Sequence, residues 1–406
     1  MSISDRPLPG VARGEAVETD REVPVCDFQA VGVATVTAGH AVNDTYTAFL
    51  PPLLPVFIAR LALSTTQAGL LNVFMQWPSL LQPFIGHLAD HVNLRYFVIL
   101  APAATATAMS LLGIAPTYLV LAALLVITGV SSAAIHAVGP VIAGNLSGRN
   151  LGRGMGFWMV GGGLGYTIGP LIIVAALDLL KPEGTPWLMV GGWLASAALY
   201  VRLRHVSSHP AGLNRSRPWR QALRAMQPLL IPVVGITVVR SFMSAALGTY
   251  LPTFLSREGA NLWFSGAALS VYEAAGMAGA LTIGSLSDRL GRRRVLAIAM
   301  VVTSPLMAAF LAVRGFAQFP VLVALGFSAL SIMPVMMALL QESFAENRAL
   351  VNGLYLGLSF LIQAGATVIL GALADSFGLR TAFSVSAALP LLGVPLLLLL
   401  PKSRSQ

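Results

Sequence analysis

The stretch HAVND places three polar side chains, His40, Asn43 and Asp44, inside the otherwise apolar segment 30–58. His40 and Asp44 are four residues apart, so on a helix they share one face. An ionisable group inside a membrane helix costs roughly 2.5–3.5 kcal/mol on insertion scales, which makes each such residue a candidate for function. Desolvation favours the uncharged form of a carboxyl, so Asp44 could take up and release a proton. The alternative is a permanent His40–Asp44 pair that only fixes the helix.

Three more ionisable side chains lie inside apolar segments. Arg240 is always charged and offers a planar fork of donors, which suits a carboxylate, phosphate or phosphonate substrate. The alternative is a structural bridge from Arg240 to Asp44. Glu273 could be a second proton site or could pair with an arginine or a backbone group. His136 could titrate near neutral pH, although a lone histidine in a helix more often serves packing.

Other chemistry finds little support in the sequence. The chain has one cysteine, and it contains no HExxH or P-loop spacing and no recognisable serine or cysteine nucleophile. We therefore expect a protein that is not an enzyme, that holds no metal and no cofactor, and that is not driven directly by ATP. Five side chains inside the apolar segments are candidates for the wall of a substrate cavity: Tyr46, Gln76, Trp158, Tyr250 and Tyr272. The alternative for the aromatic residues among them is contact with lipid or the membrane interface.

The composition requires lipid as the solvent of most of the chain. Of 406 residues, 56% are hydrophobic and 10% are charged, whereas about a quarter of the residues of a soluble domain are charged. The net charge of +9 does not indicate nucleic acid, because the charges lie between apolar segments. The sequence therefore predicts an integral membrane protein.

Twelve segments approach the roughly 20 apolar residues needed to cross a bilayer, and none alternates as barrel strands do. The predicted fold is therefore all-α, with twelve transmembrane helices. They lie near 30–58, 67–89, 95–114, 117–144, 155–177, 186–201, 229–255, 263–287, 295–313, 317–341, 351–373 and 381–401.

The distribution of basic residues sets the predicted orientation. If the termini are cytoplasmic, cytoplasmic segments hold 19 of the 25 Lys and Arg residues and outer loops hold 5, with Arg240 inside a span. This asymmetry favours cytoplasmic termini. The predicted organisation is a disordered tail (1–28), a six-helix bundle (29–201), a cytoplasmic linker (202–228), a second six-helix bundle (229–401) and a short tail (402–406).

The two halves repeat one another. Segment 67–90 aligns with 265–288 without gaps, and FLP at 49–51 recurs as YLP at 250–252. Paired six-span repeats are typical of transporters that bind substrate near the middle of the membrane, between two pseudo-symmetric bundles.

The turn between the eighth and ninth spans carries the GxxxDRxGRR signature, and the chain therefore resembles the major facilitator superfamily. The resemblance implies that this turn and its eroded copy after the second span are cytoplasmic latches. The signature residues are Gly284, Asp288, Arg289, Gly291, Arg292 and Arg293, and the copy keeps Gly86, Asp90 and Arg95. GALADSFGLR at 371–380 mimics the signature, but it falls on the outer side, where we expect Asp375 to be a loop cap.

Gly156, Gly165, Gly169 and Pro170 in the fifth span fit the pattern often called the antiporter motif, without its final double glycine. Small residues also let helices pack closely in any membrane bundle. The motif therefore supports antiport, with ordinary close packing as the alternative.

GHAVNDTY, GVSSAAIHA and LLQPFIGHLAD resemble the fosmidomycin-resistance branch of the superfamily. The resemblance implies a monomeric exporter of a small organic compound, driven by the proton gradient, in a bacterial inner membrane. Classical drug exporters carry an arginine in the fourth span where this chain has Leu125, so other residues must relay the proton. We expect protonation of Asp44 to be coupled to anion binding at Arg240. Import of a metabolite such as an organic acid, or a non-transporting sensor, remain alternatives.

Overall fold

The structure is a computed structural model that describes residues 27–400 except 90, 209–218 and 345–347, and this part of the chain contains no strand. The N-terminal half comprises α1 (Ala30–Thr47), α2 (Leu50–Leu61), α3 (Thr65–Gln76), η1 (Trp77–Leu81), α4 (Gln82–Ala89), α5 (Arg95–Leu111), η2 (Leu112–Ile114), α6 (Tyr118–Ser147), η3 (Gly148–Asn150), α7 (Leu151–Leu179), α8 (Lys181–Gly184), η4 (Thr185–Leu188) and α9 (Met189–Leu203).

The C-terminal half comprises α10 (Trp219–Ser244), η5 (Ala245–Thr249), α11 (Leu251–Arg257), α12 (Leu262–Leu290), α13 (Arg292–Ala312), η6 (Gly315–Ala317), α14 (Gln318–Ala329), α15 (Ile332–Ser343), α16 (Arg348–Phe377), α17 (Leu379–Gly393) and η8 (Pro395–Leu399). Residues 219–228, which we assigned to the linker, are helical and continue into the seventh predicted span.

Seven helical stretches in the described chain are long and apolar enough to cross a membrane by length and composition alone. One of them joins α6 to α7 over 62 residues. Several other predicted spans are broken: α1 ends at Thr47 before α2, and η1 interrupts the second span. The chain is thus an all-helical, multi-pass protein, and the count of twelve spans stays a prediction.

The first helical span of each half is interrupted at an equivalent position. The first span bends between α1 and α2 at the FLP triplet, and the seventh bends at η5, a turn of π-helix, before the YLP triplet. A proline in the first turn of α2 and of α11 lacks the N–H that a continuous helix would use. The repeated triplets therefore mark equivalent kinks.

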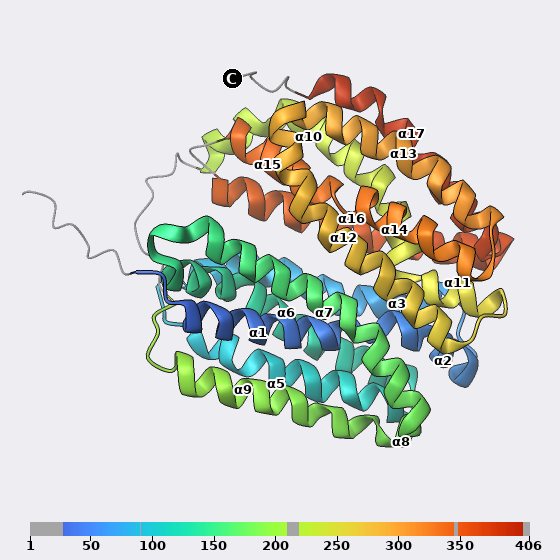
Figure 1. Ribbon diagram of the computed structural model, residues 1–406, viewed down its shortest axis with the longest axis horizontal. Helices are drawn as coiled ribbons and strands as arrows, with labels where there is room; N and C mark the ends of the chain where they lie inside the picture. The colour runs from blue at the N-terminus through green and yellow to red at the C-terminus, as the bar shows by residue number, and fades with distance from the viewer. Residues whose placement is uncertain (1–26, 90, 209–218, 345–347, 401–406) are drawn as a thin grey trace, which may run out of the picture.

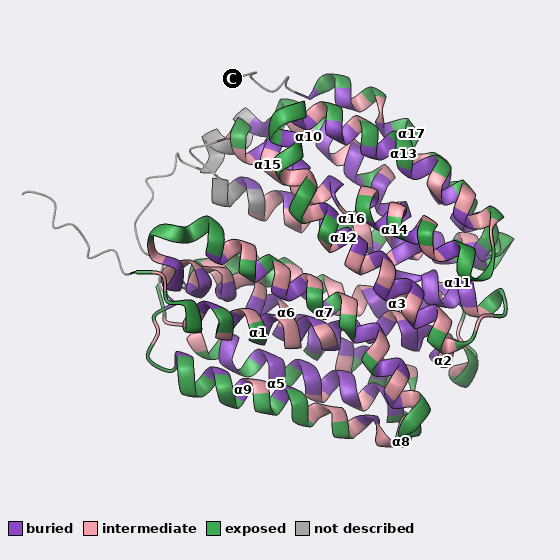
Figure 2. Cartoon of the chain, viewed as in Figure 1, coloured by how far each residue is buried: buried purple, intermediate pink, exposed green. Residues whose placement is uncertain are grey.

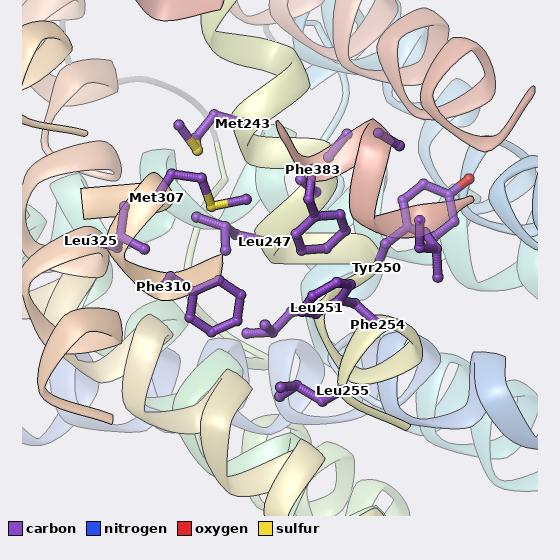
Figure 3. Close-up of a cluster of buried hydrophobic side chains, with 14 of the residues drawn as sticks. Met243, Leu247, Tyr250, Leu251, Phe254, Leu255, Met307, Phe310, Leu325 and Phe383 are labelled. Atoms are coloured by element: carbon purple, nitrogen blue, oxygen red, sulfur yellow. The ribbon is translucent and has the colours of Figure 1, made fainter. Parts of the chain in front are cut away.

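Each half has its own hydrophobic core. In the C-terminal half, Phe254, Phe310 and Phe383 pack with Met307 and Leu325, as Figure 3 shows. Purple, buried positions run through both halves in Figure 2, and green, exposed positions lie on the outer helices. The exposed positions include large apolar side chains such as Leu194 and Ile231. An apolar exterior on a helical protein is what a lipid environment requires.

The halves form two layers in Figure 1, with α3, α7, α12 and α16 along their boundary. We call the end at which α1 begins, at Ala30, the near end, and the end at which α2 finishes, at Leu61, the far end. Hydrogen bonds join the halves at the far end and at the centre, such as Trp263 with Asp178 and Asn72 with Thr249. The structure is therefore closed by direct contacts at the far end.

Candidate functional site

The centre of the N-terminal half holds a buried cluster of two histidines and one aspartate. Asp44 Oδ2 lies 3.0 Å from His40 Nε2 and 3.6 Å from His136 Nε2, and the two Nε2 atoms are 3.3 Å apart. Asp44 and His40 are buried, at 2% and 4% exposure, whereas the side chain of His136 is 31% exposed. The i, i+4 spacing on α1 brings His40 to Asp44, and α6 brings His136 to both.

The other nitrogen of each imidazole fixes which nitrogen carries hydrogen. His40 Nδ1 lies 2.9 Å from the carbonyl oxygen of Trp158, and His136 Nδ1 lies 2.8 Å from that of Ser132. A carbonyl oxygen only accepts, so Nδ1 of each ring is the donor. Both neutral rings then direct lone pairs from Nε2 toward each other and toward the Asp44 carboxylate. Three acceptors at this spacing repel one another unless a proton or another cation lies among them.

Asp44 is held from its other side by a polar chain. Asn43 Nδ2 donates to Asp44 Oδ1 over 3.0 Å, and the hydroxyl of Thr105 on α5 donates to Asn43 Oδ1 over 2.8 Å. Ser131 lies 2.9 Å beyond Thr105 and donates to the carbonyl of Ala101. Asn43 and Thr105 on α5 therefore hold the orientation of the carboxylate, and Oδ2 faces the two imidazoles.

Helix α7 forms the wall behind the cluster. Trp158 stacks on His40 with ring centroids 3.8 Å apart and an interplanar angle of 13°. A Cβ added at Gly162 would lie 2.8 Å from His40 Cε1 and 3.0 Å from Asp44 Oδ2. At Gly165 it would lie 2.6 Å from the Ala41 carbonyl oxygen. Only glycine therefore allows α7 to approach α1 this closely.

The antiporter-motif residues divide between two surroundings. Gly169 lies against α1, where an added Cβ would be 2.3 Å from the Thr45 carbonyl oxygen, and Pro170 is buried. Gly156, in contrast, has no atom within 4 Å of such a Cβ.

The C-terminal half contributes charged groups with unsatisfied hydrogen bonding. Arg240 on α10 is 9% exposed, and its Nε has no partner. Tyr272 on α12 lies within electrostatic range of Arg240 and Glu273, and its hydroxyl is also unpartnered. Among the described residues, neither Arg240 nor Glu273 forms a hydrogen bond or an ion pair. The Arg240–Asp44 bridge, which the sequence left open, is absent from this part of the chain, because Asp44 pairs with the histidines.

Tyr166 on α7, which sequence reasoning missed, lies within electrostatic range of both Asp44 and Glu273. The Tyr166 position adjoins a contact between halves: a Cβ at Gly163 would lie 2.7 Å from Met277 Cγ. Helices α7 and α12 are therefore in direct contact at the boundary between the halves.

The predicted cavity-wall residues have several different surroundings. Tyr46 lies in the core of the N-terminal half rather than on a wall, because its hydroxyl donates to the Leu188 carbonyl. Tyr250 is fully buried at the boundary, and its hydroxyl points away from the apolar cluster in Figure 3, toward the carbonyls of Thr65 and Thr367. Gln76 is half-buried, and its Oε1 has no partner.

The eighth-to-ninth turn is held within its own half. Arg292 Nη2 lies 2.7 Å from Glu342 Oε1 and also pairs with Asp288, while its Nη1 donates to the Gly284 carbonyl over 3.1 Å. Gly291 has φ +91°, a left-handed conformation that favours glycine. Arg289 is exposed and Arg293 is half-buried.

The eroded copy of this turn makes a different contact. Asn93, which replaces the signature glycine, accepts from the Ser208 hydroxyl over 3.0 Å. Arg95 lies over the Tyr96 ring at 5.3 Å, and an added Cβ at Gly86 would meet nothing within 4 Å. Asp90 lies outside the described residues. This turn is therefore fixed to the end of the N-terminal half.

The donor set of the cluster also fits a metal ion, whereas the sequence predicts none. The donor atoms of His40, Asp44 and His136 all lie within 4.8 Å of one another. The sequence showed only the His40–Asp44 spacing, because His136 comes from a helix about ninety residues further along the chain.

Comparisons with known proteins agree with this architecture. The sequence matches the profile of the Major Facilitator Superfamily over residues 36–281 and again over 236–406. It is 24% identical to the "Fosmidomycin resistance protein" of Escherichia coli (strain K12), over 100% of this chain and 99% of that protein. It is 26% identical to the "Uncharacterized MFS-type transporter YfnC" of Bacillus subtilis (strain 168), over 90% and 91%. A crystal structure of a bacterial homolog of the human lysosomal transporter Spinster, described as inward-facing and occupied, superposes with a TM-score of 0.76 at 15% identity, over 92% and 96%.

Proposed function

Because the chain belongs to the Major Facilitator Superfamily, we propose that it is a secondary transporter that exports a small organic compound in exchange for protons. The observation that carries this proposal is the buried set of three converging acceptors on His40, Asp44 and His136. A proton among them removes their mutual repulsion, and its loss restores that repulsion. Export, rather than import, is supported by the similarity to a full-length relative named for fosmidomycin resistance.

The proposed topology has twelve spans with both termini in the cytoplasm of a bacterial cell and the protein in its inner membrane. It is supported by the 19 basic residues on the termini side against 5 on the other. The near end is then cytoplasmic, and the far-end contacts close the outer side. Substrate and protons reach a central site from one side at a time, in a single chain without a cofactor.

The proton enters and leaves through His136. It is the most exposed member of the cluster, at 31%, while His40 and Asp44 lie behind it at 4% and 2%. An imidazole can take a proton at Nε2 and pass it to a neighbouring acceptor within hydrogen-bond reach. Asp44 stabilises the resulting positive charge, and the Asn43–Thr105 chain keeps its carboxylate in place.

The substrate is an anion that binds at Arg240. Its guanidinium is nearly buried without a hydrogen-bonded partner at Nε, and a buried, unsatisfied donor favours a ligand that accepts from it. The unpartnered hydroxyl of Tyr272 lies within range of the same group.

Inside-out membrane vesicles test this proposal. With a proton gradient imposed, the parent protein is expected to accumulate a labelled anionic test compound such as a phosphonate, and Asp44→Asn is expected to transport it without dependence on the gradient. Glu183→Gln, which changes an exposed acid of the far end, is the matched control and keeps coupling. Unchanged pH dependence in Asp44→Asn would reject Asp44 as the coupling site. Loss of compound from preloaded inside-out vesicles would instead indicate import, and no movement of any compound would favour a sensor.

A further inference from the structure

The far end carries a carboxylate from one half on the end of a helix from the other half. Asp375, near the end of α16, accepts from the Thr65 N–H over 2.7 Å and from the Thr66 N–H over 2.9 Å. The Thr66 hydroxyl donates to the same carboxylate over 2.6 Å. Thr65 and Thr66 are the first residues of α3, whose N–H groups have no acceptor inside the helix.

Ser64 and Asp375 both accept hydrogen bonds from N–H groups in the first turn of α3. Ser64 accepts from the Gln67 N–H over 3.1 Å, and Gln67 Oε1 accepts from the Ser64 N–H over 2.9 Å. That capping box lies within the N-terminal half and is independent of the position of the other half. Asp375 satisfies the preceding two N–H groups from across the boundary, with the positive end of the helix dipole favouring its charge.

Neighbouring contacts hold the same two threonines. Arg257 Nη2 donates to Thr65 Oγ1 over 3.1 Å, and the Tyr250 hydroxyl donates to the Thr65 carbonyl over 3.2 Å. A Cβ added at Gly371 would lie 2.9 Å from Thr66 Cα, so α16 and α3 touch backbone to backbone. Opening the far end must break all of these contacts together.

We propose that Asp375 is a positioning residue that latches the far end shut, and that its release is a required step of each opening toward the outside. This inference rests on the proposed alternating access. It differs from the near-end turn, where Asp288 and Glu342 pair with Arg292 inside one half. The sequence likeness of 371–380 to the latch signature thus belongs to a contact between halves, and Asp375 caps a helix of the other half rather than its own loop.

The latch sets the balance between the closed and open far end. Without the carboxylate, two N–H groups of α3 lose a charged acceptor that the other half supplies only when the far end is closed, so the closed form loses stability relative to the open form. We expect Asp375→Asn to shift the closed-to-open ratio by on the order of tenfold toward the open form. Thr66→Val, which removes only the hydroxyl donor, should shift it in the same direction by less.

Distances between spin labels measure this ratio directly. Labels at Glu183→Cys and Phe316→Cys, two exposed far-end positions on opposite halves, are placed in a Cys26→Ser background, because Cys26 is the single native cysteine. Double electron–electron resonance on the purified protein should show a longer-distance population that grows in Asp375→Asn. Ser64→Ala, which weakens the cap of the same helix inside one half, should leave the distribution unchanged.

An unaltered distance distribution in both Asp375→Asn and Thr66→Val would overturn the latch, as would an equal shift in Ser64→Ala. These distances need no substrate, so the latch can stand if the proposed export fails, and export can stand if the latch fails. Thermal unfolding of each variant separates a changed conformational balance from a general loss of stability, since the balance shifts at temperatures far below unfolding.

Discussion

The chemistry of the buried cluster depends on which imidazole nitrogen is free. Because backbone carbonyls occupy Nδ1 of His40 and of His136, the reactive nitrogens face Asp44. His136→Gln keeps a polar side chain but removes the titrating group, so we expect proton-coupled transport to fall by at least tenfold. His87→Gln, an exposed histidine of α4, serves as the control and keeps coupling. If His136→Gln carries out proton-coupled transport at the same rate as the parent protein, His136 is not part of the proton path.

The affinity for an anion should depend on the shape of the Arg240 side chain as well as its charge. Arg240→Lys retains the charge but loses the planar fork, whereas Arg240→Ala loses both. A charged hydrogen bond contributes roughly 1.5–3 kcal/mol, so Arg240→Ala should raise KM for an anionic substrate about 10- to 100-fold, with a smaller rise for Arg240→Lys. Transport assays at several substrate concentrations separate KM from kcat. Equal KM values in all three proteins would place the anion elsewhere.

The cluster should work with a proton as its only cation. Treatment with a metal chelator should leave proton-coupled transport unchanged, because three acceptors need one bridging proton and no further ligand. Activity that is lost on chelation and restored by zinc would assign the three donor atoms, which lie within 4.8 Å of one another, to a metal instead.

Sequence reasoning found the part of the site that lies on one helix. The four-residue spacing of His40 and Asp44 predicts their contact, because helical geometry alone brings them together. Thr105 and Trp158 reach the cluster from α5 and α7, and no local pattern marks them. Tertiary packing decides those contacts, which is why Trp158 was expected on a cavity wall and stacks instead on His40.

At the scale of elements, the approach of α7 to α1 should be sensitive to single methyl groups. Gly162→Ala places a Cβ 2.8 Å from a His40 ring that is already stacked on Trp158, and such overpacking costs about 1–3 kcal/mol. We expect a lower melting temperature and loss of coupling. Gly156→Ala, on the same helix in open space, should instead stabilise by roughly 0.5–1 kcal/mol. Melting curves of both variants with a coupling assay test the contrast, and similar behaviour of the two would contradict it.

The helices follow the apolar segments closely, but their breaks do not follow from hydropathy. The FLP and YLP triplets were recognised as a repeat, and the structure adds that each begins a new helix after a kink. Proline in the first turn is the available signal. The extent of α10 was underestimated because its first residues, from Trp219, are polar and basic, which resembles a linker in composition.

At the scale of the whole molecule, the duplicated sequence predicts two similar halves but does not predict at which end they contact each other. Equivalent halves can meet at either end, and only contacts between residues far apart in sequence, such as Asp375 with Thr66, select the far end. Composition identified the membrane environment, because an apolar exterior must be matched by lipid. The family follows from the match over nearly the whole chain after residue 36.

The central claim is that binding of the exported compound and binding of a proton exclude each other through the His40–Asp44–His136 cluster. Purified protein in weakly buffered detergent solution can be mixed with an anionic substrate found in the vesicle assay while a pH indicator is monitored. The account predicts proton release on binding in the parent and in Glu183→Gln, and none in Asp44→Asn. Substrate binding without proton release in the parent, or equal release from Asp44→Asn, would contradict it.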